Sequence, residues 1–275
     1  MESRTAKIVL RVMAAFALAF LYIPLIVVVI YAFNPSVGQK WPLPGFTFKW
    51  FSSAWNNGDV RSAIRTSFLV ATTATVWALL IGSAAAFAVH RFRFFGQNAV
   101  SFVLLLPIAL PGIVTAMALN STINTFGLPL STYTIIIGHS TFCIVVVYNN
   151  VVARLRRTPT SLVEASMDLG ADGWQTFRLV TFPAIRTALV AGALLAFALS
   201  WDEIVVTNFV SGTQITVPKW IFDHIRQPRN RPVVNVVGLF LMLLSIIPVY
   251  FAQRLAGSGE GAPSLRPAAS EPAGR

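Results

Sequence analysis

The most constraining feature of this sequence is a stretch from Phe94 to Ala153 that contains no Asp, Glu, Lys or Arg. A bilayer-spanning helix needs about 20 mostly apolar residues, because the hydrocarbon core is about 30 Å thick. The stretch is long enough for two such helices, and Gly127 and Pro129 supply a turn between them. Only 11% of the whole chain is charged, whereas soluble domains carry about 25% charged residues. This composition excludes a soluble enzyme.

Six apolar stretches are predicted to span a membrane, which gives an all-α, polytopic fold with six transmembrane helices. The third stretch contains Pro107, Pro111 and Gly112, which should kink or interrupt its helix. Broken helices line cavities in transporters, although a kink can also serve packing alone. The fifth stretch is the only one that carries acids, Asp202 and Glu203. The six stretches lie near residues 12–33, 66–89, 99–119, 133–153, 187–210 and 233–253.

The distribution of charge predicts the orientation. The net charge is +11, but the basic residues are scattered singly and form no stripe with interleaved aromatics, which disfavours nucleic acid as a partner. Six passes put both termini on one side, and assigning them to the cytoplasm places a majority of the Lys and Arg residues inside. We therefore expect a cytoplasmic N-terminus (1–11), a transmembrane domain (12–255) and a disordered, cytoplasmic tail rich in Gly, Ala, Ser and Pro (256–275).

The long polar segment at residues 158–183, between the fourth and fifth spans, is dense in helix signals. These signals predict a compact elbow of two short helices that projects from the cytoplasmic side of the membrane. They are a Thr158–Pro159 start, a capping-box spacing at Ser161 and Glu164, a helix-ending Gly170, a second capping spacing at Asp172 and Gln175, and a helix-stopping Pro183.

The same segment carries a spaced motif. Glu164, Ala165 and Ser166 are followed after three residues by Gly170, and nine residues further on by the sequence VTFP, which ends at Pro183. This pattern resembles the EAA loop of the integral permeases of bacterial ABC importers, with mild replacements at three apolar or small positions. The resemblance covers roughly residues 8–255. Within the family, the segments SWDEIVVTNFVSG and VPKWIFDHIRQPRNRPVVN look most like the permeases of spermidine and putrescine importers.

The resemblance implies a permease subunit of an ATP-driven importer in the bacterial inner membrane. No Walker A sequence occurs in the chain, so we expect no cofactor here and no enzyme activity, with ATP hydrolysis on a partner. The implied partners are a cytoplasmic ABC ATPase dimer, a second permease subunit, expected to be a paralogue, and an extracytoplasmic substrate-binding protein. In this family the loop docks on the ATPase. The resemblance therefore implies that five residues couple this chain to the ATPase: Glu164, Ala165, Ser166, Gly170 and Pro183.

Trp201, Asp202 and Glu203 are the candidates for a substrate pathway. Ionisable residues in a span are costly and usually face protein or water, so the two acids could attract an organic polycation with Trp201 beside them. Helical spacing places Glu203 on one face with Ser200 and Thr207, which makes Glu203 the better candidate of the two acids. The alternative is that the acids lie at the outer interface or pair with one of three downstream arginines, Arg226, Arg229 and Arg231.

Four polar residues of the fourth span are expected to pack or to form hydrogen bonds with neighbouring helices, and Cys143 to pack. The four are His139, Ser140, Asn149 and Asn150. Two other functions stay open. The first is a permease for another small solute, such as iron, a phosphonate or another amine. The second is an ion-coupled secondary transporter, which would need charges near the middle of the membrane. A membrane-embedded enzyme is disfavoured by missing hydrolase and zinc motifs.

Overall fold

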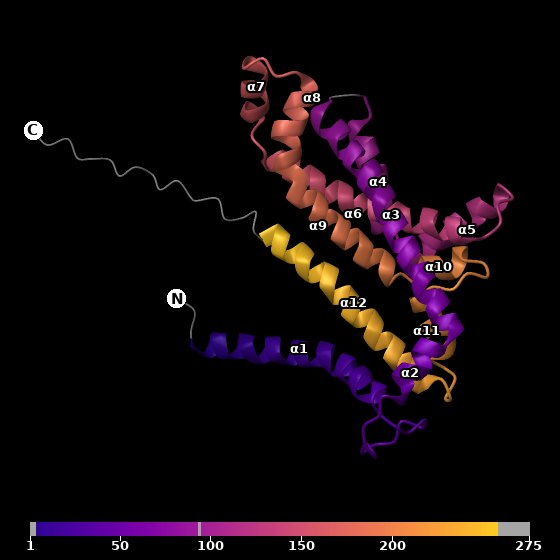
Figure 1. Cartoon of the computed structure of the whole chain (residues 1–275). Coiled ribbons are helices and arrows are strands. Elements are labelled where there is room, and N and C mark those ends of the chain that lie inside the picture. The colour runs from indigo at the N-terminus through magenta and orange to yellow at the C-terminus, as the bar shows by residue number, and fades with distance from the viewer. Residues whose placement is uncertain (1–3, 93–94, 258–275) are drawn as a thin grey trace, which may run out of the picture.

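The computed structural model describes residues 4–92 and 95–257, and within these residues it contains helices and loops but no strand (Figure 1). The tail expected at 256–275 lies outside the described residues from position 258 on. The helices are α1 (Arg4–Ala32), α2 (Lys49–Asn56), α3 (Gly58–Arg91), α4 (Gln97–Ala109), α5 (Gly112–Thr125), α6 (Thr132–Arg157), α7 (Thr160–Asp168), α8 (Gly173–Thr176), the π-helical turn η1 (Phe177–Thr181), α9 (Phe182–Trp201), α10 (Val205–Val210), α11 (Val217–His224) and α12 (Arg231–Gly257).

Five of the described helical segments are long and apolar enough to cross a membrane. They are Ala6–Ala32, Gly58–Arg91, Thr132–Arg157, Gly173–Trp201 and Arg231–Leu255. The remaining predicted span is divided into α4 and α5 at Leu110 and Pro111, which confirms the predicted interruption. Pro111 has no N–H group and the residue before a proline avoids the helical conformation, so the helix ends there. The all-α fold with about six membrane passes is therefore confirmed.

The centre of the molecule is formed by α3, α6 and α9, whose small residues permit close approach. A Cβ atom on Gly82 of α3 would lie 2.8 Å from the carbonyl oxygen of Ile144 in α6. Ala86, one turn further along α3, is fully buried. Cys143 is also buried, and its thiol donates a hydrogen bond to the carbonyl of Ala196 in α9. Small side chains thus let three long helices pack into one core.

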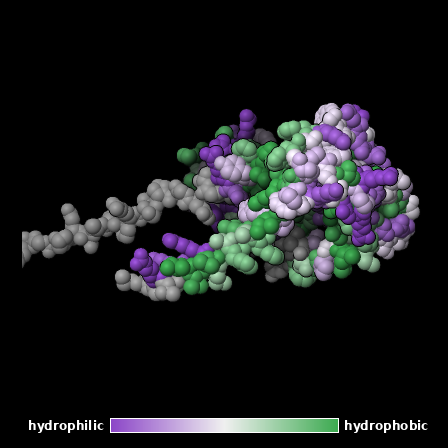
Figure 2. All heavy atoms as spheres, turned by 90° about the horizontal axis from the view of Figure 1, so that it is seen from below, coloured by the Kyte–Doolittle hydropathy of each residue, from purple (hydrophilic) through white to green (hydrophobic). Residues whose placement is uncertain are grey.

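A second core joins α2 and α11 to the end of α1 and the start of α12. It contains Trp50, Trp220 and Val237, all buried. Beyond this junction α1 extends away from the other helices, and its residues between Ala6 and Val27 are exposed (Figure 1). Hydrophobic side chains are exposed over much of the surface as well (Figure 2). In a membrane these surfaces are suited to lipid or to another apolar protein surface.

Three sequence predictions about the elbow are wrong. Thr158 does not cap α7, because Pro159 is the N-cap residue and the Thr158 hydroxyl donates to the carbonyl of Arg154 in α6. Ser161 and Glu164 lie inside α7, which starts at Thr160 without a side-chain cap, so their capping box does not form. Pro183 does not end a helix, because the chain is helical from α8 through η1 into α9. The π-helical turn η1 precedes it, in which the N–H of Phe182 bonds to the carbonyl of Phe177. Such a turn shifts the hydrogen-bond register and accommodates a residue that lacks an N–H group.

The fifth span also differs from its prediction. It is longer at the elbow end, and it does not continue to residue 210, because the helix stops at Trp201 and resumes at Val205. Asp202 and Glu203 therefore lie in a break between α9 and α10 and not inside a continuous helix. A break exposes backbone polar groups, which must find partners within the protein or in water.

Candidate functional site

The elbow, defined as residues 160–181, lies at one end of the molecule, beyond the ends of α3 and α6 (Figure 1). None of the residues of α7 is buried. The hydroxyl groups of Ser166 in α7 and Thr176 in α8 lie 3.0 Å apart and form a hydrogen bond. Thr176 is buried, so this bond fixes the two short helices against each other from inside the elbow.

Gly170 makes the turn between α7 and α8, as predicted. Its φ angle is +85°, in the left-handed region that side chains with a Cβ atom rarely adopt. The N–H of Gly170 bonds to the carbonyl of Met167, and the N–H of Ala171 bonds to that of Ser166, which together form a Schellman motif. No atom lies within 4 Å of a Cβ placed on Gly170, so backbone conformation, and not space, requires glycine here.

The start of α8 confirms the second predicted cap. The carboxylate of Asp172 accepts a hydrogen bond from the N–H of Gln175 at 2.8 Å, and the Gln175 amide accepts from the N–H of Asp172 at 3.0 Å. Trp174 stacks on Phe177 with ring centroids 5.7 Å apart. Phe177 also meets Phe87 of α3 edge to face at 5.6 Å. This aromatic contact connects the elbow to the central core.

The outer surface of the elbow is apolar and acidic. Leu169, at the tip, is 89% exposed, and Leu162, Met167 and Trp174 are exposed as well. Glu164, which lies in α7, is exposed too. A surface of this kind, held by internal hydrogen bonds and made of apolar side chains beside a carboxylate, suits contact with another protein. Of the predicted coupling residues, Ala165 and Pro183 are exposed and Ser166 is half-buried.

The break between α9 and α10 is the second candidate site. The carboxylate oxygen Oε1 of Glu203 accepts a hydrogen bond from the N–H of Val206 at 2.9 Å, and so caps α10. The Glu203 carbonyl accepts from the hydroxyl of Thr207 at 3.0 Å. Asp202 is exposed, and its backbone N–H closes the last turn of α9. The two adjacent acids therefore have different surroundings.

His139 of α6 fixes this break from behind. Its Nδ1 lies 2.7 Å from the hydroxyl of Ser200 in α9, and its Nε2 lies 2.9 Å from the hydroxyl of Thr207 in α10. All three residues are buried. The expectation of an interhelical hydrogen-bonding role for His139 is thus correct. The sequence did not identify its partners, although the spacing that put Ser200 and Thr207 on one face was the available signal.

The Trp201 indole is buried at the end of α9. It is 1% exposed, and it stacks on Phe197 at 6.0 Å with an angle of 12° between the ring planes. One face of the ring is thus occupied by another aromatic ring, and the place of Trp201 in a substrate pathway stays a prediction. Among the described residues, neither Asp202 nor Glu203 forms an ion pair with the downstream arginines, and the alternative position of the acids at the outer interface stays a prediction.

Within residues 4–92 and 95–257, no three His, Cys, Asp or Glu side chains are placed to hold a metal ion. The architecture, a helical membrane domain with a projecting elbow, is typical of the integral subunits of membrane transporters. Residues 78–258 match the family described as the inner membrane component of binding-protein-dependent transport systems, and the chain belongs to this family.

Curated relatives agree with this assignment. The chain is 35% identical over 240 residues to the spermidine/putrescine transport system permease protein PotC of Escherichia coli (strain K12), covering 86% of this chain and 90% of the relative. It is 34% identical over 232 residues to the putrescine transport system permease protein PotI of the same organism, covering 81% and 82% of the two chains.

Solved structures agree on the fold. A bacterial ABC transporter involved in the import of alginate matches with a TM-score of 0.68 at 17% identity, covering 94% of this chain and 98% of the other. The alginate transporter in complex with a periplasmic protein that carries alginate pentasaccharide gives 0.69 at 15% identity, with 93% and 95% coverage. An inward-facing MetNI methionine transporter gives 0.58 at 18% identity, with 78% and 99% coverage. The fold is that of an ABC importer permease.

Proposed function

We propose that this chain is a transmembrane subunit of an ATP-driven importer that carries polyamines, such as spermidine and putrescine, across the inner membrane. The observation that carries this proposal is the 35% identity to PotC, which extends over 86% of the chain. The similarity to PotI supports the same cargo class. The chain itself contributes no ATP-binding motif, so it acts as the pathway and the lever, and hydrolysis belongs to a separate subunit.

The elbow is the surface on which that ATPase docks. Closure of an ATPase dimer must reach the membrane helices as a displacement, and a rigid connection transmits it better than a soft loop. The Gly170 turn, the hydrogen bond from Ser166 to Thr176 and the contact of Phe177 with Phe87 supply this rigidity. Glu164 is the polar anchor of the docking surface. Ala165 and Pro183 complete it.

The other partners follow from the same architecture. A second permease subunit, which we expect to be a paralogue, covers part of the exposed apolar surface of α1. An extracytoplasmic binding protein delivers cargo at the opposite end from the elbow; one of the solved relatives is a complex with a periplasmic protein. Both termini and the elbow lie in the cytoplasm, in agreement with the excess of Lys and Arg on that side.

Two elbow substitutions test the coupling role. Gly170→Asp places a side chain at φ +85°, and Glu164→Lys reverses the charge of the anchor. We expect both variants to reach the membrane in normal amount, but spermidine uptake in reconstituted vesicles should fall at least about tenfold, which corresponds to about 1.4 kcal/mol, while ATP hydrolysis persists. Asp223→Lys, a charge reversal at an exposed position of α11, is the matched control. Normal uptake by Glu164→Lys and Gly170→Asp would contradict docking through the elbow.

The break near the outer end of α9 is the proposed point of cargo contact. The contacts of the two acids favour Asp202 as the group that meets the cation, since Glu203 is half-buried and caps α10. This reverses the preference that helical spacing alone gave. Trp201 supports the site by packing, because its face is stacked on Phe197.

Neutral substitutions separate the two acids. Asp202→Asn should raise the KM for spermidine uptake about three- to tenfold with unchanged membrane abundance, because it removes one charge that attracts a polycation. Glu203→Gln keeps an oxygen that can accept from Val206, so we expect a smaller rise. Asp223→Asn controls for a general change of surface charge. Wild-type kinetics in Asp202→Asn and Glu203→Gln would remove both acids from the route and leave the permease role intact.

A further inference from the structure

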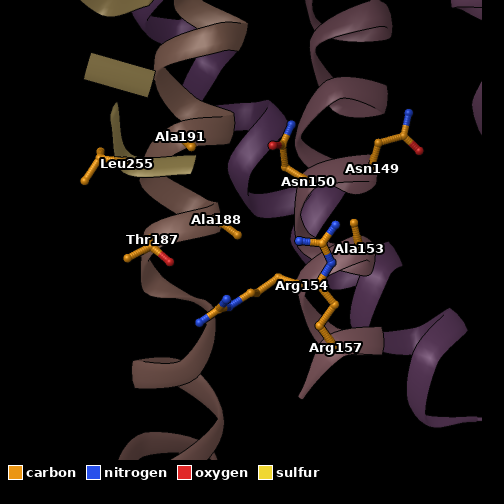
Figure 3. A pocket seen from close by; sticks show the side chains of 9 residues that line it. All are labelled: Asn149, Asn150, Ala153, Arg154, Arg157, Thr187, Ala188, Ala191 and Leu255. Carbon is orange, nitrogen blue, oxygen red and sulfur yellow. The ribbon is translucent and has the colours of Figure 1, made fainter. Parts of the chain in front are cut away.

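A polar cavity of about 340 Å³ lies between the ends of α6, α9 and α12, on the side of the molecule where the elbow projects. Its lining from α6 includes Asn149, Asn150, Arg154 and Arg157, and α9 contributes Thr187. Figure 3 shows the two arginine side chains extending from α6 into the space that faces α9. Neither the fold nor the proposed transport function has given this cavity a role.

The guanidinium group of Arg154 is held in place, and both guanidinium groups have unused donors. Nε of Arg154 donates to the carbonyl of Ala184 at 2.9 Å, which anchors the side chain across the gap from α6 to α9. This bond uses one of the five N–H donors of the group. Among the described residues, neither Arg154 nor Arg157 pairs with a carboxylate, and no acid lines the cavity.

The chemistry of the lining selects an anion of a particular kind. Guanidinium groups are planar forks that match the oxygens of a phosphate, and Arg is over-represented where phosphate is recognised. The hydroxyl of Thr187 lies in the same lining and can add a hydrogen bond to a phosphate oxygen. The opposite part of the wall is apolar and includes Ala191 and Leu255.

We propose that this cavity binds a phosphate group, supplied by the headgroup of an anionic phospholipid or by free phosphate. Basic pockets between transmembrane helices on the cytoplasmic side are suited to anionic headgroups, and the apolar wall formed by α9 and α12 can accept the start of an acyl chain. A phosphate held by Arg154 and Arg157 of α6 and by Thr187 of α9 bridges α6, which leads into α7, and α9, which follows the elbow. The bound group therefore stiffens the base of the elbow.

Native mass spectrometry of the purified full-length chain tests the site with phosphatidylglycerol as the probe. Wild-type protein should retain the lipid saturably. Arg157→Gln should weaken binding about fivefold, and adding Arg154→Gln about fivefold more. Arg156→Gln is the matched control, because Arg156 lies on the same turn of α6 and is exposed but does not line the cavity. It should bind within about twofold of wild type.

A second variant tests the cavity without a change of charge. Ala153 is an exposed residue of the lining, so Ala153→Phe fills the space while folding remains intact, and it should weaken binding as Arg157→Gln does. Calorimetry with inorganic phosphate identifies the source of the phosphate group. Loss of phosphatidylglycerol in both variants supports a lipid headgroup, and loss of inorganic phosphate alone supports free phosphate. If both variants bind both probes as tightly as Arg156→Gln, the proposal is wrong, whether or not the importer carries polyamines.

Discussion

The elbow follows the end of the long helix α6, and the break follows the end of the long helix α9, but the two differ in what surrounds them. In the elbow, no residue of α7 is buried, and the hydrogen bonds stay within about ten residues of sequence. In the break, His139 joins Ser200 and Thr207 from 61 and 68 residues away. The elbow is thus a locally built surface that another protein can cover, whereas the break is a fixed part of the membrane core.

Further contacts hold the short helix after the break. The hydroxyl of Thr134 in α6 donates to the carbonyl of Val210 at 2.7 Å, and the amide of Asn120 in α5 donates to the carbonyl of Phe209. Val206 and Val210 belong to the central apolar core. These bonds satisfy backbone groups that an interrupted helix leaves open within a membrane. A substitution here should therefore cost stability, while one at an exposed side chain of the elbow should cost only function.

The largest expected difference comes from two glycines. A Cβ on Gly138 of α6 would lie 2.8 Å from Cγ1 of the buried Val206, whereas a Cβ on Gly173 of α8 would meet nothing within 4 Å. Gly138→Leu should destabilise the protein by about 3 kcal/mol through overpacking, and Gly173→Leu by less than about 0.5 kcal/mol. Thermal unfolding in detergent, followed by the loss of the monodisperse peak, measures both. Equal stabilities would show that the break is not tightly packed.

An intermediate effect is expected at His139. His139→Leu leaves the buried hydroxyls of Ser200 and Thr207 without their shared partner, and should cost about 2 kcal/mol. Ser140→Ala is the control on the same helix, because its hydroxyl bonds only to the carbonyl of Ile136, one turn earlier. Since Glu203 lies on the other side of Thr207, His139→Gln should restore stability in part and shift the KM for polyamine less than His139→Leu does. Unchanged stability in His139→Leu would remove the histidine from the support of the break.

The same contrast explains what the sequence could predict. Three features could be predicted from composition and spacing, because each depends on a few neighbouring residues. They are the membrane spans, the left-handed turn at Gly170, and the helix cap formed by Asp172 and Gln175. The spacing at Ser161 and Glu164 matched a capping box equally well, but the helix starts at Thr160. Helix starts are set by tertiary contacts as well as by local signals, and a spacing rule alone cannot choose among several candidates.

The failures in the fifth span have a longer-range cause. Pro183 has no N–H group to donate, and the helix continues through it because the π-helical turn η1 shifts the hydrogen-bond register just before it. A π-helical turn has no simple sequence pattern. The burial of Trp201, which stacks on Phe197, likewise depends on how α9 packs. The break itself depends on His139, which lies in another helix. A single sequence shows the face that Ser200 and Thr207 share, but not which helix it meets.

The smallest expected effect on stability, and the sharpest test of the elbow as a docking surface, is at Leu169. This side chain is 89% exposed, so Leu169→Ser should change the stability of the isolated chain by less than about 0.5 kcal/mol. Burying a leucine side chain contributes about 1.5 to 3 kcal/mol, so loss of this contact should weaken binding of the ATPase subunit at least about tenfold. Leu128→Ser is the control, because Leu128 is also an exposed leucine but lies in the loop between α5 and α6, far from the elbow. This variant should not change binding of the ATPase. Affinity measured by titrating the purified ATPase onto the reconstituted chain decides the outcome. If Leu169→Ser and Leu128→Ser bind the ATPase equally well, the apolar tip of the elbow is not part of the contact, and its exposure needs another explanation.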